Sequence, residues 1–336
     1  MPQLHDNMYD IAIIGGGPTG LACAIEATKN NLLAIVIEKG TVADSIRRFP
    51  VNMTFFSTAD LLELDNIPFT ATGARPTRTE AVKYYQRVSE RMGINVLHHT
   101  RVLQIIKNDE SSLYSISTDN GSIIARTCIV ATGYFDTTNS LNVPGEHLPH
   151  VHRYYTEGFA YHGAKVVVIG GKNSAVETAL DLWRHGADVT IVHRRETLGA
   201  SVKYWIKPDI ENRLKNGEIH AHFSSVVTKI ENGAVHIKSL ADNSESIIPC
   251  DFVIPHIGYR PDATLLRGAG IEVDDTTCIP TFDPETFESN VRGLYLAGSV
   301  QCGCESWNIF IENGRAHAQP IITHIITHIM QTHLTS

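Results

Sequence analysis

The feature that most constrains the fold is a G-x-G-x-x-G turn, Gly15 to Gly20, that directly follows the apolar run 9–14. The run predicts a buried parallel strand, and residues from about 21 to 30 predict a helix. Gly15 permits a tight turn, and Gly17 lets the backbone approach a pyrophosphate at the helix N-terminus. Gly20 allows close helix–strand packing. The pattern therefore predicts the start of a dinucleotide-binding domain.

A second apolar run, residues 32–37, ends at Glu38. A carboxylate at this place can accept hydrogen bonds from ribose hydroxyls. Strand, turn, helix, strand and acid together predict a doubly wound α/β sheet. Because an acid repels a 2′-phosphate, Glu38 favours an unphosphorylated ribose, as in FAD or NAD.

The opening pattern repeats later in the chain: residues 165–169 predict a strand, 176–185 a helix and 188–192 a further strand. Self-similarity on this scale predicts a second copy of the fold. Its turn carries Lys172 where a glycine is usual. The residues expected to bind a dinucleotide at this turn are Gly170, Gly171, Lys172, Asn173, Ser174 and Ala175.

The last strand of this repeat ends in His193, Arg194 and Arg195. Guanidinium groups match phosphate oxygens, so this basic end favours the 2′-phosphate of NADP(H). The second site is therefore expected to bind NADPH, which leaves FAD for the first site.

Length and composition fit two modest globular domains. The chain has 336 residues, and its formal net charge of -8 argues against general nucleic-acid binding. The sequence shows no signal peptide pattern and no apolar run long enough to span a bilayer. The six cysteines are sparse, which suggests a cytoplasmic protein with reduced thiols. We expect a discontinuous FAD domain, residues 1–155 and 258–336, with an NADPH domain, residues 160–255, inserted in it.

Further motifs carry a family resemblance. The segments 128–133 and 293–298 resemble the two flavin motifs of thioredoxin-reductase-like, two-domain FAD/NADPH oxidoreductases. Within this branch, the segments 49–58, 75–81 and 308–315 resemble the bacillithiol disulfide reductase (YpdA-type) family. That resemblance implies two nested Rossmann-like, three-layer domains. It implies FAD contacts at Gly15, Gly17, Pro18, Thr19, Gly20, Glu38, Lys39, Val102, Ala131, Thr132, Gly133, Gly298 and Ser299.

The same resemblance implies an NADPH-dependent enzyme that reduces a low-molecular-weight thiol disulfide and forms a homo-oligomer, dimer or tetramer. Two departures matter: Thr19 stands where better-known members carry a cysteine, and Ser299 stands where the branch usually has aspartate. The alternatives are a reductase of a ferredoxin- or flavodoxin-type carrier, a flavin monooxygenase, and a non-enzymatic redox sensor that binds both nucleotides.

The sequence does not decide which cysteines, if any, are redox-active. The chain has no C-x-x-C, but Cys302 and Cys304 follow the second flavin motif, at the expected start of a helix. A helix N-terminus lowers a thiol pKa, so this pair is the candidate redox centre, with two packed small residues as the alternative. His324 and His328 lie four residues apart without a third ligand, and we expect no metal site.

Overall fold

The computed structural model describes residues 8–108, 110–304 and 308–330, the last three as backbone only. The chain divides into two compact units. Unit 1 contains residues 1–48, 53–137 and 259–336, and unit 2 contains residues 49–52 and 138–258. No helix among the described residues is long and apolar enough to cross a membrane.

Unit 1 is built on a seven-stranded sheet in the order β3-β2-β1-β6-β5-β4, with β16 also paired to β6. Strands β2, β1, β6 and β16 pair in parallel, whereas β4, β5 and β6 pair in antiparallel fashion. The strands are β1 (Tyr9–Ile14), β2 (Ala34–Ile37), β3 (Val96–Leu97), β4 (Val102–Lys107), β5 (Tyr114–Thr118), β6 (Gly121–Val130) and β16 (Leu294–Leu296). Because β16 joins β6, the chain returns to its first sheet near the C-terminus.

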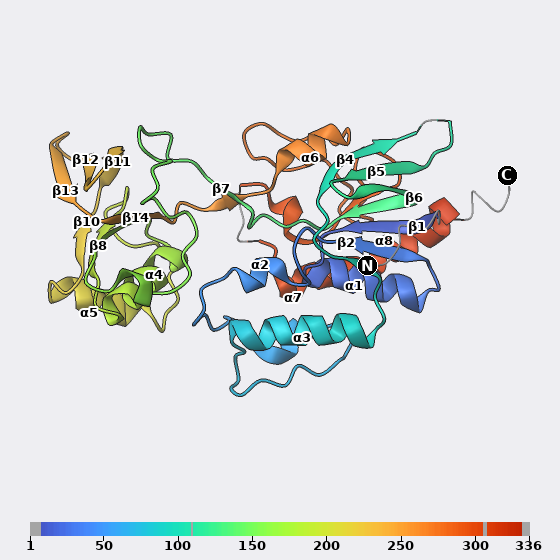
Figure 1. Ribbon diagram of the computed structural model, residues 1–336, viewed down its shortest axis with the longest axis horizontal. Coiled ribbons are helices and arrows are strands. Elements are labelled where there is room, and N and C mark those ends of the chain that lie inside the picture. Colours follow the sequence, from blue (N-terminus) through green and yellow to red (C-terminus); the bar gives the residue numbers. More distant parts are fainter. Residues whose placement is uncertain (1–7, 109, 305–307, 331–336) are drawn as a thin grey trace. The chain divides into compact units, whose positions relative to one another are not determined.

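Helices cover both faces of this sheet. Helices α1 (Pro18–Lys29) and α8 (Ala318–His324) pack against the face that carries Ile11 and Ile13 (Figure 1). Helix α6 (Ala263–Gly268) contributes Leu266 to the core on the opposite face. This three-layer arrangement confirms the predicted α/β class.

Thr77 followed three residues later by Glu80 is a capping-box pattern that predicts a helix start, and helix α3 (Arg78–Arg91) begins there. The Thr77 hydroxyl accepts a hydrogen bond from the Glu80 amide at 3.3 Å. The Glu80 carboxylate accepts one from the Thr77 amide at 2.8 Å. Two backbone donors without helical partners are thereby satisfied.

Unit 2 contains a four-stranded parallel sheet in the order β10-β9-β8-β14 and a three-stranded antiparallel sheet, β11-β12-β13. Helix α4 (Asn173–Arg184) follows β8, and α5 (Lys207–Lys215) follows β9. The strands are β8 (Lys165–Ile169), β9 (Asp188–Val192), β10 (His220–His222), β11 (Ser225–Glu231), β12 (Ala234–Ser239), β13 (Glu245–Pro249) and β14 (Phe252–Pro255). This unit therefore repeats the strand–turn–helix–strand start of unit 1.

Two predictions about helices need correction. Helices α1 and α4 begin at Pro18 and Asn173, inside the glycine turns, and not at the first apolar residues that follow. Proline fits the first helical position because its missing N–H would have no helical partner there. The sequence also predicts one long C-terminal helix, whereas the structure divides residues 311–330 into consecutive short helical segments. The remaining elements are α2 (Asp44–Arg47), η1 (Ala59–Leu62), β7 (Thr137–Thr138), η2 (Phe159–Tyr161), β15 (Tyr259–Arg260), η3 (Gly298–Cys302), α7 (Ile311–Gly314), η4 (Arg315–His317) and η5 (Ile325–Met330).

Candidate functional site

The first glycine turn has two packed glycines and one open glycine. A Cβ atom at Gly15, where φ is +111°, would lie 2.5 Å from the Ala131 carbonyl oxygen. A Cβ atom at Gly20 would lie 2.0 Å from the Gly15 oxygen, whereas one at Gly17 would meet no other group of the described chain within 4 Å. Gly15 and Gly20 are therefore required by packing. Gly17 leaves the backbone open where a ligand can approach the N-terminus of α1.

Glu38 connects the end of β2 to this turn. One of its carboxylate oxygens accepts a hydrogen bond from the Gly16 amide at 2.6 Å, and the other accepts one from the Gly40 amide at 2.8 Å. Burial raises the pKa of Glu38, and these two hydrogen bonds oppose that shift. Both oxygens keep further lone pairs, so the carboxylate can still accept a ribose hydroxyl.

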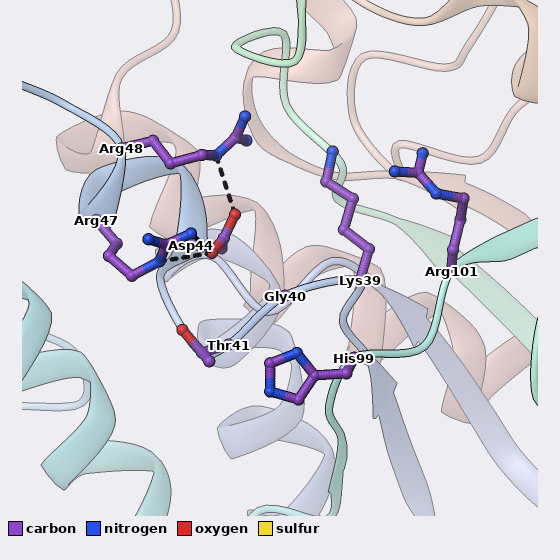
Figure 2. A pocket seen from close by; sticks show the side chains of 8 residues that line it. All are labelled: Lys39, Gly40, Thr41, Asp44, Arg47, Arg48, His99 and Arg101. Carbon is purple, nitrogen blue, oxygen red and sulfur yellow. Dashed lines mark hydrogen bonds and ion pairs between the residues drawn. The ribbon is translucent and has the colours of Figure 1, made fainter. Parts of the chain in front are cut away.

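A basic cavity of about 400 Å³ lies next to Glu38, in the range of small-molecule sites. Its lining residues are Lys39, Gly40, Thr41, Asp44, Arg47, Arg48, His99 and Arg101. Figure 2 shows Arg47 and Arg48 converging on Asp44, while the charged ends of Lys39 and Arg101 extend to the same side. The Thr41 hydroxyl is buried and has no hydrogen-bond partner among the described residues, so an added ligand could satisfy it.

Lys39 is an expected FAD contact, whereas the sequence did not predict the other basic residues that line this cavity. The adjacent Arg47 and Arg48 were the available signal, although their segment has no clear periodicity. Lys39 forms an ion pair with Asp136, which also binds Arg48. Val102, an expected FAD contact, begins β4 directly after the cavity residues and is half-buried. The cavity therefore adds basic residues to the predicted contacts at Glu38, Lys39 and Val102.

The two flavin motifs come together beside the first turn. The Ala131 amide donates a hydrogen bond to the Ile14 carbonyl at 2.8 Å, and Thr132 follows it. A Cβ atom at Gly133 would lie 3.4 Å from the Ser299 hydroxyl, and one at Gly298 would lie 2.7 Å from the Thr19 hydroxyl. The structure thus brings the predicted first-site residues to one edge of the unit 1 sheet.

The second turn is closed on one side by a later segment of unit 2. The Asn173 side chain donates to the Ser201 carbonyl at 3.0 Å and accepts from the Lys203 amide at 2.8 Å. Lys172 and Ser174 are exposed, whereas Gly171 and Ala175 are buried. Gly170, with φ of +140°, packs so closely that a Cβ atom would lie 2.4 Å from the His256 carbonyl oxygen. Lys172 is therefore compatible with the turn because its side chain points to solvent.

Of the three basic residues that follow β9, His193 is buried, whereas Arg194 and Arg195 are exposed. The His193 ring packs on Gly171, where a Cβ atom would lie 2.5 Å from it. Burial lowers the pKa of His193, and the two arginines lower it further. Its Nε2 atom is buried without a partner in the described part of the chain, an arrangement that a bound dinucleotide would satisfy.

The structure contradicts two expectations about the thiols. Cys302 ends the short helix η3, and the next helix among the described residues, α7, begins at Ile311, so neither cysteine of the pair lies at the start of a described helix. Burial raises the pKa of Cys302, although hydrogen bonds from the Ile309 and Asn308 amides oppose the shift. The expected lowered pKa is therefore wrong. Cys304 is exposed and its thiol contacts Cys278.

The C-terminal histidines have protein partners. His317 Nδ1 accepts a hydrogen bond from the Gly298 amide at 3.1 Å, and His324 Nδ1 lies 2.8 Å from the Tyr295 hydroxyl. No group of three or more metal-ligating side chains occurs among the described residues. His328 lies outside the residues whose side chains are described.

Residues 12–298 match the family model of the pyridine nucleotide-disulphide oxidoreductases. The chain is 40% identical over 313 residues to bacilliredoxin reductase Bdr of Bacillus subtilis, covering 93% of this chain and 96% of that protein. It also resembles the structure of bacillithiol disulfide reductase Bdr (YpdA) from Bacillus cereus, with 37% identity, a TM-score of 0.91 and coverage of 95% and 99%. The Staphylococcus aureus counterpart gives 34% identity, a TM-score of 0.91 and coverage of 95% and 98%.

The fold, the two glycine turns and the whole-chain similarity all indicate the same family. The chain therefore belongs to the bacillithiol disulfide reductase (YpdA) family of the pyridine nucleotide-disulphide oxidoreductases, and it is a flavoprotein oxidoreductase of the disulfide reductase type that binds FAD and NAD(P)H.

Proposed function

We propose that this protein uses NADPH to reduce a low-molecular-weight thiol disulfide of the bacillithiol disulfide class. The observation that carries the proposal is the similarity, over nearly the whole chain, to proteins named bacillithiol disulfide reductase. We assign FAD to unit 1 and NADPH to unit 2. The geometry of each unit supports its assignment.

In unit 1, residues of the first turn and the cavity fit the AMP half of FAD. The open backbone at Gly17 and the N-terminus of α1 suit a pyrophosphate. Glu38 suits the ribose hydroxyls, and the cavity next to it offers the Thr41 hydroxyl, which has no hydrogen-bond partner in the described part of the chain. The same residues would not select FMN, which lacks the AMP half.

In unit 2, the exposed Arg194 and Arg195 support the choice of NADPH over NADH. Both guanidinium groups are accessible at the end of β9, where the 2′-phosphate is expected. The neutral His193 ring beside Gly171 supplies a further hydrogen-bonding atom. The two arginines would attract the dianionic 2′-phosphate, which NADH lacks, and this attraction would favour NADPH.

When bound, FAD would take a hydride from NADPH and pass two electrons to the disulfide. We propose that this chain supplies no obligatory thiol for that reaction. Thr19 replaces the family cysteine, and its hydroxyl is directed at Gly298. Cys302 is buried and holds its proton, which makes it a poor nucleophile.

We also propose a homo-oligomer, dimer or tetramer, because the family resemblance implies one. Light scattering on the purified FAD-loaded protein measures the mass directly. A monomer at micromolar concentration would contradict this part of the proposal.

The test of the function is a panel of electron acceptors offered with NADPH to the FAD-loaded protein. The panel contains bacillithiol disulfide, glutathione disulfide, an oxidised bacilliredoxin, a ferredoxin and a quinone. We expect the highest kcat/KM with bacillithiol disulfide. Faster turnover with ferredoxin or the quinone would contradict the proposed substrate class, and faster turnover with bacilliredoxin would assign a protein disulfide instead.

A further inference from the structure

Two cysteines of unit 1, Cys278 and Cys304, lie side by side although they are distant in sequence. The Cys304 amide donates a hydrogen bond to the Thr277 carbonyl at 2.7 Å. The Cys304 thiol is hydrogen-bonded to the Cys278 thiol. The structure therefore places Cys304 with Cys278, whereas the C-x-C spacing suggests a pair with Cys302.

The loop that carries Cys278 is firmly held. The Asp274 carboxylate accepts hydrogen bonds from the amides of Thr276 and Thr277 at 2.9 and 2.6 Å. The Cys278 amide donates to the Asp274 carbonyl at 2.9 Å. Cys278 itself has φ of +57°, a left-handed conformation that is costly for residues other than glycine, asparagine and aspartate. The loop thus holds a thiol in a fixed place at some cost in backbone strain.

Accessibility separates this pair from the other cysteines. Cys304 is exposed and Cys278 is partly exposed, whereas Cys23, Cys128, Cys250 and Cys302 are buried. A disulfide from solution can therefore reach Cys304 without opening the core.

The raised pKa of Cys304 indicates slow thiol–disulfide exchange. Burial and the hydrogen bond with Cys278 raise the pKa of Cys304, and the Arg260 guanidinium opposes the shift. A thiol that holds its proton near neutral pH exchanges slowly. The pair suits equilibration with a pool of thiols better than a step in each turnover.

We propose that Cys278 and Cys304 form a thiol–disulfide exchange site that takes low-molecular-weight disulfides. The Cys304 thiolate attacks one sulfur of the disulfide RSSR, which gives a mixed disulfide and releases one RS⁻. The Cys278 thiolate then attacks the Cys304 sulfur, which forms the Cys278–Cys304 bond and releases the second RS⁻. The two protons from the cysteines end on the two RSH products. The protein pair loses two electrons and RSSR gains them.

The site goes beyond the proposed function because it requires neither NADPH nor the flavin. Its crosslink would join the loop 274–278 to the segment that follows η3, within the same unit. An excess of thiol would reverse the reaction by the same steps. The oxidation state of the pair would then follow the ratio of disulfide to thiol in solution.

The test uses the full-length, FAD-loaded protein, reduced, desalted and kept without NADPH. Glutathione disulfide serves as the probe, and free thiols are then alkylated before peptide mass spectrometry. We expect a Cys278–Cys304 crosslink, loss of two of the six thiols, and reversal by reduced glutathione. Cys278→Ser should instead accumulate a glutathionyl adduct on Cys304, and Cys304→Ser should form no crosslink.

Cys302→Ala is the matched control, because it keeps both thiols of the pair and should crosslink like the wild type. A Cys302–Cys304 crosslink, six free thiols after exposure to the probe, or separate adducts on Cys278 and Cys304 would each overturn the proposal. Mapping of the wild type alone decides the matter if a variant fails to fold. Because no turnover is measured, the result is independent of the proposed reductase activity.

Discussion

The Glu38 carboxylate accepts a hydrogen bond from the Gly16 amide at 2.6 Å, which connects the end of β2 to the first glycine turn. From the sequence, Glu38 is expected only to accept hydrogen bonds from ribose hydroxyls. In the structure Glu38 also fixes the backbone of the turn that we propose to bind the pyrophosphate. One side chain can thus order the site before the nucleotide binds, which lowers the entropic cost of binding.

We predict that Glu38→Gln weakens FAD binding. The amide side chain can accept only with its oxygen, so one of the two backbone hydrogen bonds is lost, at a cost of about 1–3 kcal/mol. Fluorescence titration of the apoprotein should show the dissociation constant rising about fivefold or more. Glu90→Gln, on the exposed face of α3, is the control and should bind normally. Release of FMN by the acid-treated wild type would contradict the assignment of this site.

Arg194→Glu should reduce selectivity for NADPH. The substitution removes a guanidinium group from the expected 2′-phosphate and adds a repelling charge, which costs about 1–3 kcal/mol of binding. The ratio of kcat/KM for NADPH to that for NADH measures the effect. Lys215→Glu, an exposed charge reversal in the same unit, should leave the ratio unchanged. Equal efficiency with both nucleotides in the wild type would remove the basis for the prediction.

The sequence predicted most of the fold because its signals are local. The strands β1, β8 and β9 match their apolar runs, and the capping box correctly located the start of α3. The helix starts were predicted too late because apolar periodicity does not detect the first turn, which is formed by glycine and proline. Similarity to whole proteins also confirmed the family resemblance that segments 49–58 and 308–315 had suggested.

The cavity and the thiol contacts could not be predicted in the same way. Arg101 and Arg47 line the same cavity although they are distant in sequence, and neither segment carries a motif. Cys278 and Cys304 meet through a loop whose conformation depends on Asp274. Such contacts join distant segments, so spacing along the chain gives no signal for them. Short spacing was misleading at Cys302 and Cys304.

His256 should make unit 2 less stable in acid. Burial lowers the pKa of His256 from 6.5 to about 4, and the ring lies 2.8 Å from the Thr178 hydroxyl. Because the folded pKa lies below the unfolded one, the unfolded state binds more protons as the pH falls below 6.5. Stability should fall by about 2 kcal/mol between pH 7 and pH 5 from this group. Urea unfolding at both pH values should show a smaller loss in His256→Asn, and an equal loss in both proteins would contradict the assignment.

The double variant Cys302→Ser/Cys304→Ser should keep fast flavin reduction by NADPH and most of its turnover with the disulfide. Cys302 is buried with a raised pKa, and Cys304 faces solvent beside Cys278. Stopped-flow absorbance and steady-state assays measure the two steps separately. A loss of about a hundredfold in turnover with unchanged flavin reduction, nearly 3 kcal/mol of transition-state stabilisation, would show that the pair is catalytic.

The most direct test of the account is the number of thiols released per NADPH consumed, measured under argon with bacillithiol disulfide and the FAD-loaded wild type. Reduction of one disulfide by one hydride requires two thiols per NADPH. We predict this ratio, with saturation in both substrates and no activity in the apoprotein. Consumption of NADPH without release of thiols would contradict the assignment of this protein as a disulfide reductase.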